Sequence, residues 1–428
     1  MKSLRLVLLA VGVAGASLGL AACGGGGGPG EKTLDLTIGD SVPLSGALAP
    51  FGPPGQKAAD IAVDQINEAI GAAGVDHSVK IIHEDNETKP DAAVSVARKM
   101  VDEGASCIAG AWASADTIPT ARSVSIREGV LQISPASTSD EITGIEDNGL
   151  LNRTSPPDRF QGPTLAAIMD EDFGAQGKTV NIGARNDAYG TGLADTFSAA
   201  WEGLGGKIGE KVIYDPEQPS YDSEAQQITS GNPDAILIID FPETFAKVGP
   251  ALARTANWDP SKMWFTDGLA SSDPGADPAD LEGAHGTAPG TPEKDPATTA
   301  FDKLYAKSPP KDVKLSAFDA QNFDAVVLCY LSAVAAGSTD GQDMADEVRD
   351  VSAPPGTKYT WQDLPDAIKA LQDGKDIDYE GASGAVNMDD AGDSTAEVYD
   401  EYTFKGGELK IIGEHRVVLP KGEEAPSG

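Results

Sequence analysis

Apolar segments of strand length alternate along the chain with segments of helical periodicity. In GQKAADIAVDQINEAI (55–70), small and branched apolar residues recur at three- and four-residue spacing, which is typical of one buried helix face. The predicted strands are 34–44, 78–86, 107–112, 130–136, 179–187, 207–215, 235–240 and 262–268. The predicted helices between them are 55–70, 91–104, 114–129, 157–173, 189–205 and 243–256. This alternation, which restarts near residue 157, predicts an α/β fold of two domains with parallel sheets.

Two segments depart from the alternation. We expect 150–156 to be a crossing segment rather than a core strand, and 285–290 to be a loop. Further along, 318–337 and 361–374 read as helices, and 397–417 reads as two strands around Lys405-Gly406-Gly407. A C-terminal third of this kind returns to both domains, and several crossings between them would make a hinge.

The first residues are typical of an export signal. Lys2 and Arg5 precede an apolar stretch (6–20) that is too short and too rich in Gly and Ala for a convincing membrane span. Leu20-Ala21-Ala22-Cys23 resembles the lipobox of bacterial lipoproteins, which implies cleavage before Cys23 and attachment of diacylglycerol to its sulfur. We therefore expect a signal peptide over 1–22, followed by a lipidated cysteine and glycine-rich tether over 23–33. An ordinary secretory signal with a chance cysteine is the alternative.

Composition narrows the classes of partner. The chain has 428 residues, which is too long for one hydrophobic core, and its formal net charge is −35. Such an acidic protein is a poor candidate for binding nucleic acid, because phosphate contacts need clusters of Lys and Arg. We predict a globular protein outside the cytoplasm.

The other two cysteines lie in apolar segments. Cys107 falls in SCIAGAW and Cys329 in DAVVLCYLSAV. Two cysteines so far apart do not form a disulfide framework, and we interpret both as small buried side chains rather than a disulfide.

Signals for catalysis are weak. The four histidines show no paired metal-ligand spacing, and no G-x-S-x-G nucleophile motif occurs. Gly190-Thr191-Gly192 lacks the third glycine of a dinucleotide site. We predict no metal, no cofactor and no enzymatic activity.

Candidate binding residues follow the predicted strands. In open parallel sheets, ligands bind outside the carboxyl ends of the strands. The residues there include hydroxyls, aromatic rings and one acid: Phe51, Ser114, Thr138, Tyr189, Phe241 and Asp267. A hydroxyl at a helix start can hold a carboxylate, and an acid can hold an ammonium group. Together they suit a zwitterionic amino acid, although each residue alone also fits a cap, a turn or a packing position.

Four segments carry a family resemblance. VPLSGALAPFG, SPASTSDEIT, NDAYGTGLA and FDAQNFDAVVL resemble the branched-chain amino-acid (Leu/Ile/Val) binding proteins of ABC transporters, over about 34–417. The resemblance implies a type I periplasmic-binding-protein fold, in which two Rossmann-like lobes with parallel sheets are joined by a three-segment hinge and close on the ligand. Lobe 1 would comprise 34–156 and 291–395, and lobe 2 would comprise 157–290 and 396–428.

The resemblance also implies a role for each matching position. Ser114 would hold the ligand carboxylate, the Ala136 carbonyl would accept from the ammonium group, and Thr138 would contact both. Asp267 would pair with the ammonium group. The remaining expected contacts are Ser137 in the same loop, Tyr189 and Phe241 closing over the ligand, and Phe51, Trp112 and Phe318 around its side chain.

Some positions differ from the family pattern. Asp267 replaces a longer glutamate, Phe241 replaces a tyrosine, and Ala113 stands where some members carry a cysteine. These differences leave the preferred side chain open.

The resemblance implies a lipid-anchored binding protein at the cell surface or in the periplasm. It would deliver a small, branched-chain amino acid to an ABC permease and its ATPase. The alternatives are a binding protein for an amide, urea or aromatic acid, a ligand sensor with the same fold, and a secreted hydrolase, for which no nucleophile and base are evident.

Overall fold

A computed structural model describes residues 33–292, 294–395 and 398–418. The predicted signal peptide, the lipidation site at Cys23 and nearly all of the glycine-rich tether lie outside these residues and stay predictions. The strands and helices confirm the predicted α/β class.

The first sheet is parallel throughout, with the strand order β2-β1-β3-β4-β5. Its strands are β1 (Leu34–Val42), β2 (His77–Asp85), β3 (Cys107–Ala109), β4 (Leu131–Ser134) and β5 (Leu151–Arg153). The interpretation of 150–156 as a mere crossing segment is therefore wrong. Residues 151–153 are buried and hydrogen-bonded to β4, and the run is so short that it shows no strand periodicity.

The second sheet has the order β15-β14-β10-β9-β8-β6-β7. Its strands are β6 (Thr179–Arg185), β7 (Lys207–Tyr214), β8 (Ala235–Ile239), β9 (Met263–Phe265), β10 (His285–Pro289), β14 (Val398–Phe404) and β15 (Leu409–Arg416). The strands from β7 to β10 pair in parallel, whereas β14 pairs antiparallel with both β10 and β15. The predicted C-terminal hairpin is confirmed.

Strand β10 corrects the prediction of a loop at 285–290. Gly286 and Pro289 have low strand propensity, which hid the strand in the sequence. A Cβ at Gly286 would lie 2.3 Å from the Tyr402 ring, so the glycine allows the close approach of β14. A small additional sheet, β11-β12-β13, consists of Thr357–Thr360, Ile377–Gly381 and Gly384–Ala385.

Helices cover both faces of the two main sheets. They are α1 (Gly52–Ala73), α2 (Pro90–Asp102), α3 (Ser114–Thr120), α4 (Ile126–Glu128), α5 (Asp158–Phe173), α6 (Ala188–Gly203), α7 (Asp222–Ile228), α8 (Pro242–Ala253), α9 (Pro296–Lys307), α10 (Asp319–Ala336), α11 (Gly341–Ser352) and α12 (Leu364–Gln372). The helix predicted over 114–129 is divided into α3 and α4 by a π-helical turn, η2 (Ala121–Ser125).

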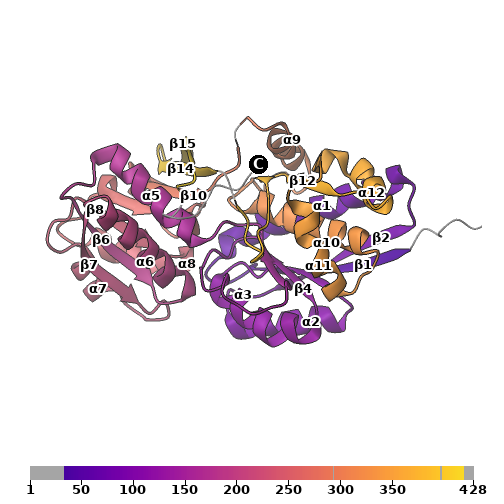
Figure 1. Cartoon of the computed structure of the whole chain (residues 1–428). Helices are drawn as coiled ribbons and strands as arrows, with labels where there is room; N and C mark the ends of the chain where they lie inside the picture. Colours follow the sequence, from indigo (N-terminus) through magenta and orange to yellow (C-terminus); the bar gives the residue numbers. More distant parts are fainter. Residues whose placement is uncertain (1–32, 293, 396–397, 419–428) are drawn as a thin grey trace, which may run out of the picture. The chain divides into compact units, whose positions relative to one another are not determined.

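The core of the first sheet explains its sequence pattern. Apolar residues of α1, α10, α11 and α12 pack on one face, and α2 contributes to a separate apolar cluster on the other face (Figure 1). Helix α10 is buried from Asp319 to Val334, which accounts for its nearly uninterrupted apolar sequence. Among the described residues, no single helix is long and apolar enough to cross a membrane, and only the pair α10 and α11, bent by 105°, meets that length and composition together.

The two cysteines correct a third prediction. Cys107 and Cys329 are both buried, as expected, but they form a disulfide that joins β3 to α10, with their Cα atoms 5.9 Å apart. Sequence alone could not pair two cysteines separated by 222 positions. The disulfide attaches the long core helix to the middle of the first sheet.

We expect the double substitution Cys107→Ala and Cys329→Ala to lower the free energy of unfolding by about 2–4 kcal/mol, because the cross-link restricts the unfolded chain. Urea unfolding followed by circular dichroism measures the change. Each single substitution is the control, since it removes the cross-link with the loss of only one sulfur. Identical midpoints for the wild type and all three variants would show that the disulfide contributes no stability.

Candidate functional site

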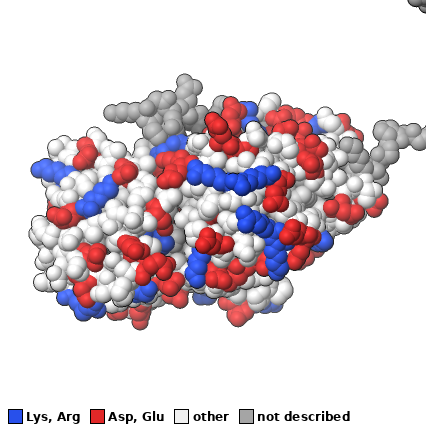
Figure 2. Space-filling view, turned by 90° about the horizontal axis from the view of Figure 1, so that it is seen from below, with Lys and Arg blue, Asp and Glu red and all other residues white. Residues whose placement is uncertain are grey.

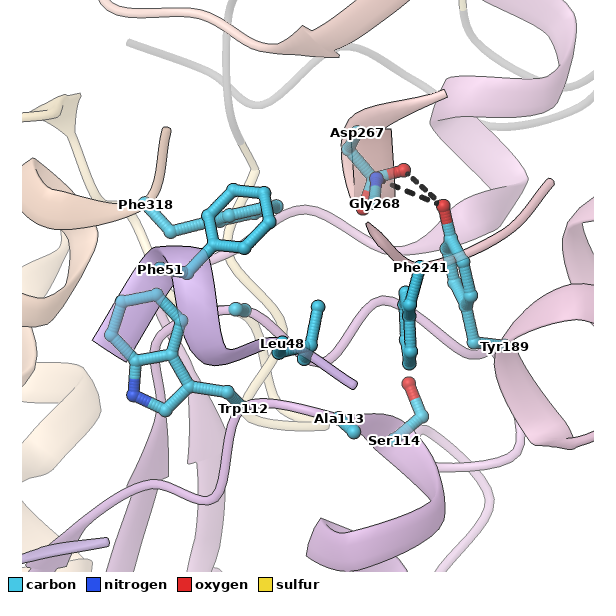
Figure 3. Close-up of a pocket in the computed structure, with 11 residues that line it drawn as sticks. Leu48, Phe51, Trp112, Ala113, Ser114, Tyr189, Phe241, Asp267, Gly268 and Phe318 are labelled. Atoms are coloured by element: carbon cyan, nitrogen blue, oxygen red, sulfur yellow. Dashed lines mark hydrogen bonds between the residues drawn. The ribbon is translucent and has the colours of Figure 1, made fainter. Parts of the chain in front are cut away.

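A small pocket of about 20 Å³ lies where loops from the carboxyl ends of both main sheets meet. Its walls come from segments far apart in the chain: Leu48, Phe51, Trp112, Ala113, Ser114, Ala136, Tyr189, Phe241, Asp267, Gly268 and Phe318 (Figure 3). These segments follow β1, β3, β4, β6, β8 and β9, and Phe318 directly precedes α10. The rule that ligands bind at strand ends therefore located most of the pocket.

The structure brings together most of the predicted site residues. Phe51, Trp112, Ser114, Ala136, Tyr189, Phe241, Asp267 and Phe318 all line the pocket. Ser137 and Thr138 do not line it. The Ser137 hydroxyl instead donates to the Trp112 carbonyl oxygen at 3.0 Å and lies 2.8 Å from the Thr117 hydroxyl, so it holds two loops together.

One wall is apolar. Trp112 and Phe318 meet edge to face, with ring centroids 6.5 Å apart and an interplanar angle of 77°. The Trp112 ring has room because residue 55 is a glycine, where a Cβ would lie 2.2 Å from the ring. Phe318 has a φ of 69°, which is unusual for a bulky residue and costs about 1–3 kcal/mol. The fold therefore maintains an unfavourable backbone conformation at this wall.

The opposite wall is a stack of aromatic rings. The ring centroids of Tyr189 and Phe241 are 5.1 Å apart, and the two ring planes meet at 15°. The Arg185 guanidinium lies 3.7 Å from the centroid of the Phe241 ring and is paired with Asp187. Asp187 also caps α6 by accepting from the Gly190 N–H at 2.9 Å, which fixes the start of the helix that carries Tyr189.

The acidic end of the pocket is Asp267. Its side chain is buried, and the Tyr189 hydroxyl donates to its Oδ1 at 2.9 Å (Figure 3). Burial raises the pKa of Asp267 to about 6, and hydrogen bonding from Gln161 and Tyr189 offsets part of the rise. No basic side chain of the described residues forms a salt bridge with this carboxyl group. The Asp267 carboxyl group is therefore buried without a cationic side chain beside it.

Ser114 lies at the other end, across the Phe241 ring from Asp267 (Figure 3). It is the first residue of α3, preceded by the N-cap Ala113, and its hydroxyl oxygen accepts from the Ser139 N–H at 3.2 Å. A hydroxyl that accepts one bond can still donate its own proton. The pocket therefore offers a donor and an acid at opposite ends, with apolar walls between them.

Several buried polar residues near the pocket were not predicted. Asp116 of α3 and Arg185 of β6 influence each other electrostatically behind Phe241, and burial raises the pKa of Asp116 to about 8. Asp158 and Gln161 of α5 lie near Asp267. The sequence carried one signal for Asp158 and Gln161, because both lie in the first turns of a helix that begins directly after the last strand of the first sheet. Among the described residues, no group of three His, Cys, Asp or Glu side chains could hold a metal ion.

Comparison with known proteins places this pocket in context. The sequence profile of the family described as periplasmic binding protein matches residues 35–394. The chain belongs to the periplasmic binding protein family. This assignment confirms the resemblance on which the site residues were transferred, while the role of each residue stays a prediction.

Relatives of this periplasmic binding protein include one named for amino-acid binding and one named for chemotactic signalling. The chain is 29% identical over 386 residues to Leu/Ile/Val-binding protein homolog 3 of Brucella melitensis, covering 89% of this chain and 93% of that protein. It is 27% identical over 361 residues to the chemotactic signal transduction system substrate-binding protein BasB of Halobacterium salinarum. That match covers 82% of this chain and 83% of BasB.

A solved structure supports the fold. The branched-chain amino acid transporter substrate-binding protein LivJ of Streptococcus pneumoniae, determined in complex with isoleucine, superimposes with a TM-score of 0.72. It shares 21% sequence identity and covers 91% of this chain and 100% of its own. The α/β architecture of the two proteins is the same.

We expect Asp267→Asn to stabilise the ligand-free protein at pH 8. The folded pKa of about 6 exceeds the ordinary 3.8, so ionised Asp267 costs the fold about 3 kcal/mol above pH 6. The cost shrinks as the pH falls through 6 toward 4, because the folded protein then keeps the proton. Melting temperatures of refolded, ligand-free protein at pH 8, 6 and 4 measure the effect. Equal differences between wild type and variant at all three values would contradict the assignment.

Proposed function

We propose that this chain is an extracytoplasmic solute-binding protein that captures a small amino acid with an apolar side chain and delivers it to an ABC permease. The observation that supports it most is the buried, cation-free Asp267 facing the Ser114 hydroxyl across an apolar pocket. A carboxylate buried without a partner is costly, and an ammonium group entering the pocket would remove that cost. Ser114 would hold the ligand carboxylate, and Phe51, Trp112 and Phe318 would contact its side chain.

Binding also requires movement. A volume of about 20 Å³ accommodates about one water molecule, whereas an amino acid is several times larger. Two lobes, 34–156 with 291–395 and 157–290 with 396–428, would separate at a three-segment hinge, admit the ligand and close over it. Tyr189 and Phe241 would then cover the ligand from the second lobe.

The start of the sequence and the surface charge support the proposed location and partners. The lipobox-like sequence at Cys23 supports a membrane anchor, with the permease and its ATPase as partners. Figure 2 shows Asp and Glu side chains spread among the Lys and Arg side chains of one face. Such a mixed, acidic surface does not favour nucleic acid as a partner.

A ligand sensor is the second candidate. BasB, the chemotactic relative, supports it, because a protein that binds the same ligand can present its closed form to a signalling partner instead of a permease. Uptake of labelled ligand by cells with and without the gene distinguishes the two. Loss of uptake supports transport, and unchanged uptake with lost chemotaxis supports sensing.

We expect leucine, isoleucine or valine to raise the melting temperature of the protein, because a ligand that binds only the folded form stabilises it by mass action. A thermal-shift screen should include the common amino acids, acetamide, urea and benzoate. Stabilisation by benzoate or an amide, with no response to any amino acid, would favour the amide, urea or aromatic-acid alternative.

We expect Asp267→Asn to weaken amino-acid binding at least about thirtyfold, since losing one partner of a buried charge pair costs about 2–5 kcal/mol. Titration calorimetry with the amino acid selected by the screen measures this. The matched control is Asp280→Asn, because Asp280 is an exposed acid of the same loop region. Unchanged affinity in the Asp267 variant would remove this residue from the site.

A further inference from the structure

Helix α1 leaves a notch at Gly55, beside the apolar wall of the pocket. Gly55 is buried in the first turn of the helix, and a Cβ at this position would lie 2.2 Å from Cζ2 and 2.4 Å from Cη2 of Trp112. Carbon atoms that are not bonded to each other pack at about 3.5–4.0 Å. The Trp112 ring therefore occupies the space that a side chain at position 55 would need.

The backbone at this position does not require a glycine. Gly55 is not among the described residues with a positive φ, and it lies within an α-helix, a conformation that L-amino acids adopt readily. A glycine inside a helix is less favourable than an alanine, because it loses more conformational freedom on folding. Space for the Trp112 ring is therefore the structural reason for a glycine here.

The start of helix α1 is fixed by buried hydrogen bonds. Asn322 of α10 donates from Nδ2 to the Gly55 carbonyl oxygen at 3.0 Å. The Lys57 ammonium group donates to the carbonyl oxygens of Pro310 at 2.9 Å and of Val313 at 3.0 Å. The side chains of Asn322 and Lys57 are both at least nine-tenths buried. The helix therefore cannot move away from the indole ring without breaking buried hydrogen bonds, which is costly.

The Trp112 ring, in contrast, is held by packing alone. Within the described part of the chain its buried Nε1 makes no hydrogen bond, and the ring meets Phe318 edge to face. The Ser137 hydroxyl donates to the Trp112 carbonyl oxygen, which fixes the backbone and not the ring. Trp112 and Phe318 both line the pocket (Figure 3). A side chain at position 55 would therefore displace the ring and not the helix, and the space beside the ring is the pocket.

We propose that Gly55 is a specificity-determining residue, which gives the Trp112 ring its place against α1 and so leaves room in the pocket for a ligand side chain larger than a methyl group. The inference rests on the proposed function and narrows its substrate class to amino acids with larger aliphatic side chains. Gly55 acts through Trp112 and is a positioning residue. When the ring moves inward, a long side chain loses its space before a short one does. Close packing of α1 alone would explain the glycine, but it predicts lost stability without changed selectivity.

The test is calorimetric titration of L-leucine and L-alanine into the wild type and into Gly55→Ala. We expect Gly55→Ala to weaken leucine binding at least about tenfold and alanine binding no more than about threefold, because one methylene group in an apolar pocket changes binding about tenfold or more. The matched control is Gly71→Ala in the same helix, where a Cβ would meet nothing within 4 Å. This control should keep both affinities and melt slightly higher, since alanine is the better helix former.

A double variant identifies the residue through which Gly55 acts. Trp112→Phe removes Cζ2 and Cη2, the two atoms that lie nearest to a Cβ at position 55. We expect Gly55→Ala combined with Trp112→Phe to bind leucine within about twofold of Trp112→Phe alone, because the two substitutions share one contact. If Gly55→Ala alone does not fold, the double variant decides. Folding with this leucine affinity supports the inference, and failure to fold overturns it, because the clash then lies outside Trp112.

The remaining outcomes separate the inference from the proposed function. Unchanged binding in Gly55→Ala, equal weakening of leucine and alanine, or additive losses in the double variant would overturn the inference alone. A wild type that binds neither leucine nor alanine would overturn the proposed function together with the inference.

Discussion

A carboxyl group buried without a cation is the constraint on which the rest of this site depends. Asp267 is fixed by the Tyr189 hydroxyl and enclosed by segments from both sheets, so solvent cannot compensate its charge. The fold could have placed an arginine there, as it did for Asp393, which pairs with Arg153 at 2.6 Å. It pairs Asp393 with a cation and leaves Asp267 with hydrogen-bond donors but no cationic partner. That contrast within one structure distinguishes a structural ion pair from a position that an external cation can complete.

Under the proposed function, the aromatic and apolar walls would make the pairing of Asp267 with a ligand ammonium group strong and selective. Water around Asp267 would weaken any pairing with an ammonium group, because attraction between charges falls as the local dielectric rises. Under the proposed function, the pocket-lining rings of Trp112, Phe318, Tyr189 and Phe241 would exclude water and bury the ligand's side chain at the same time. The unfavourable backbone of Phe318 is consistent with this role, since strain at a pocket wall persists only where surrounding packing determines it. Charge and apolar contact would thus act on the same ligand and not on separate subsites.

Sequence reasoning located the pocket better than it located its surroundings. Strand ends in one parallel sheet converge, so Tyr189 and Asp267 could be placed together from the order of elements. The family resemblance was needed to bring Ser114, which follows a strand of the other sheet, to the same site. The disulfide between Cys107 and Cys329 could not, because pairing across distant segments depends on packing that no local pattern encodes. Strand β10 was hidden by Gly286 and Pro289, whose local propensity is overridden by neighbours on both sides. Asp158 was missed because an acid in the first helical turn ordinarily faces solvent, and only the three-dimensional contacts show that this one is buried.

The buried Asp267 also explains why stability and binding would oppose each other under the proposed function. Burial raises the pKa of Asp267, so its ionised form destabilises the ligand-free fold, and a bound ammonium group would return that free energy as affinity. Such a site is less stable without ligand than an uncharged pocket of the same shape. Closing on an amine would therefore release more free energy than closing of the uncharged pocket. Because this free energy would be released only when an amine lies beside Asp267, compounds that fill the apolar pocket but lack an amine would gain contact area without the electrostatic part. Discrimination for the amino group would therefore arise from the cost of the empty site and would not require additional contacts to the rest of the ligand.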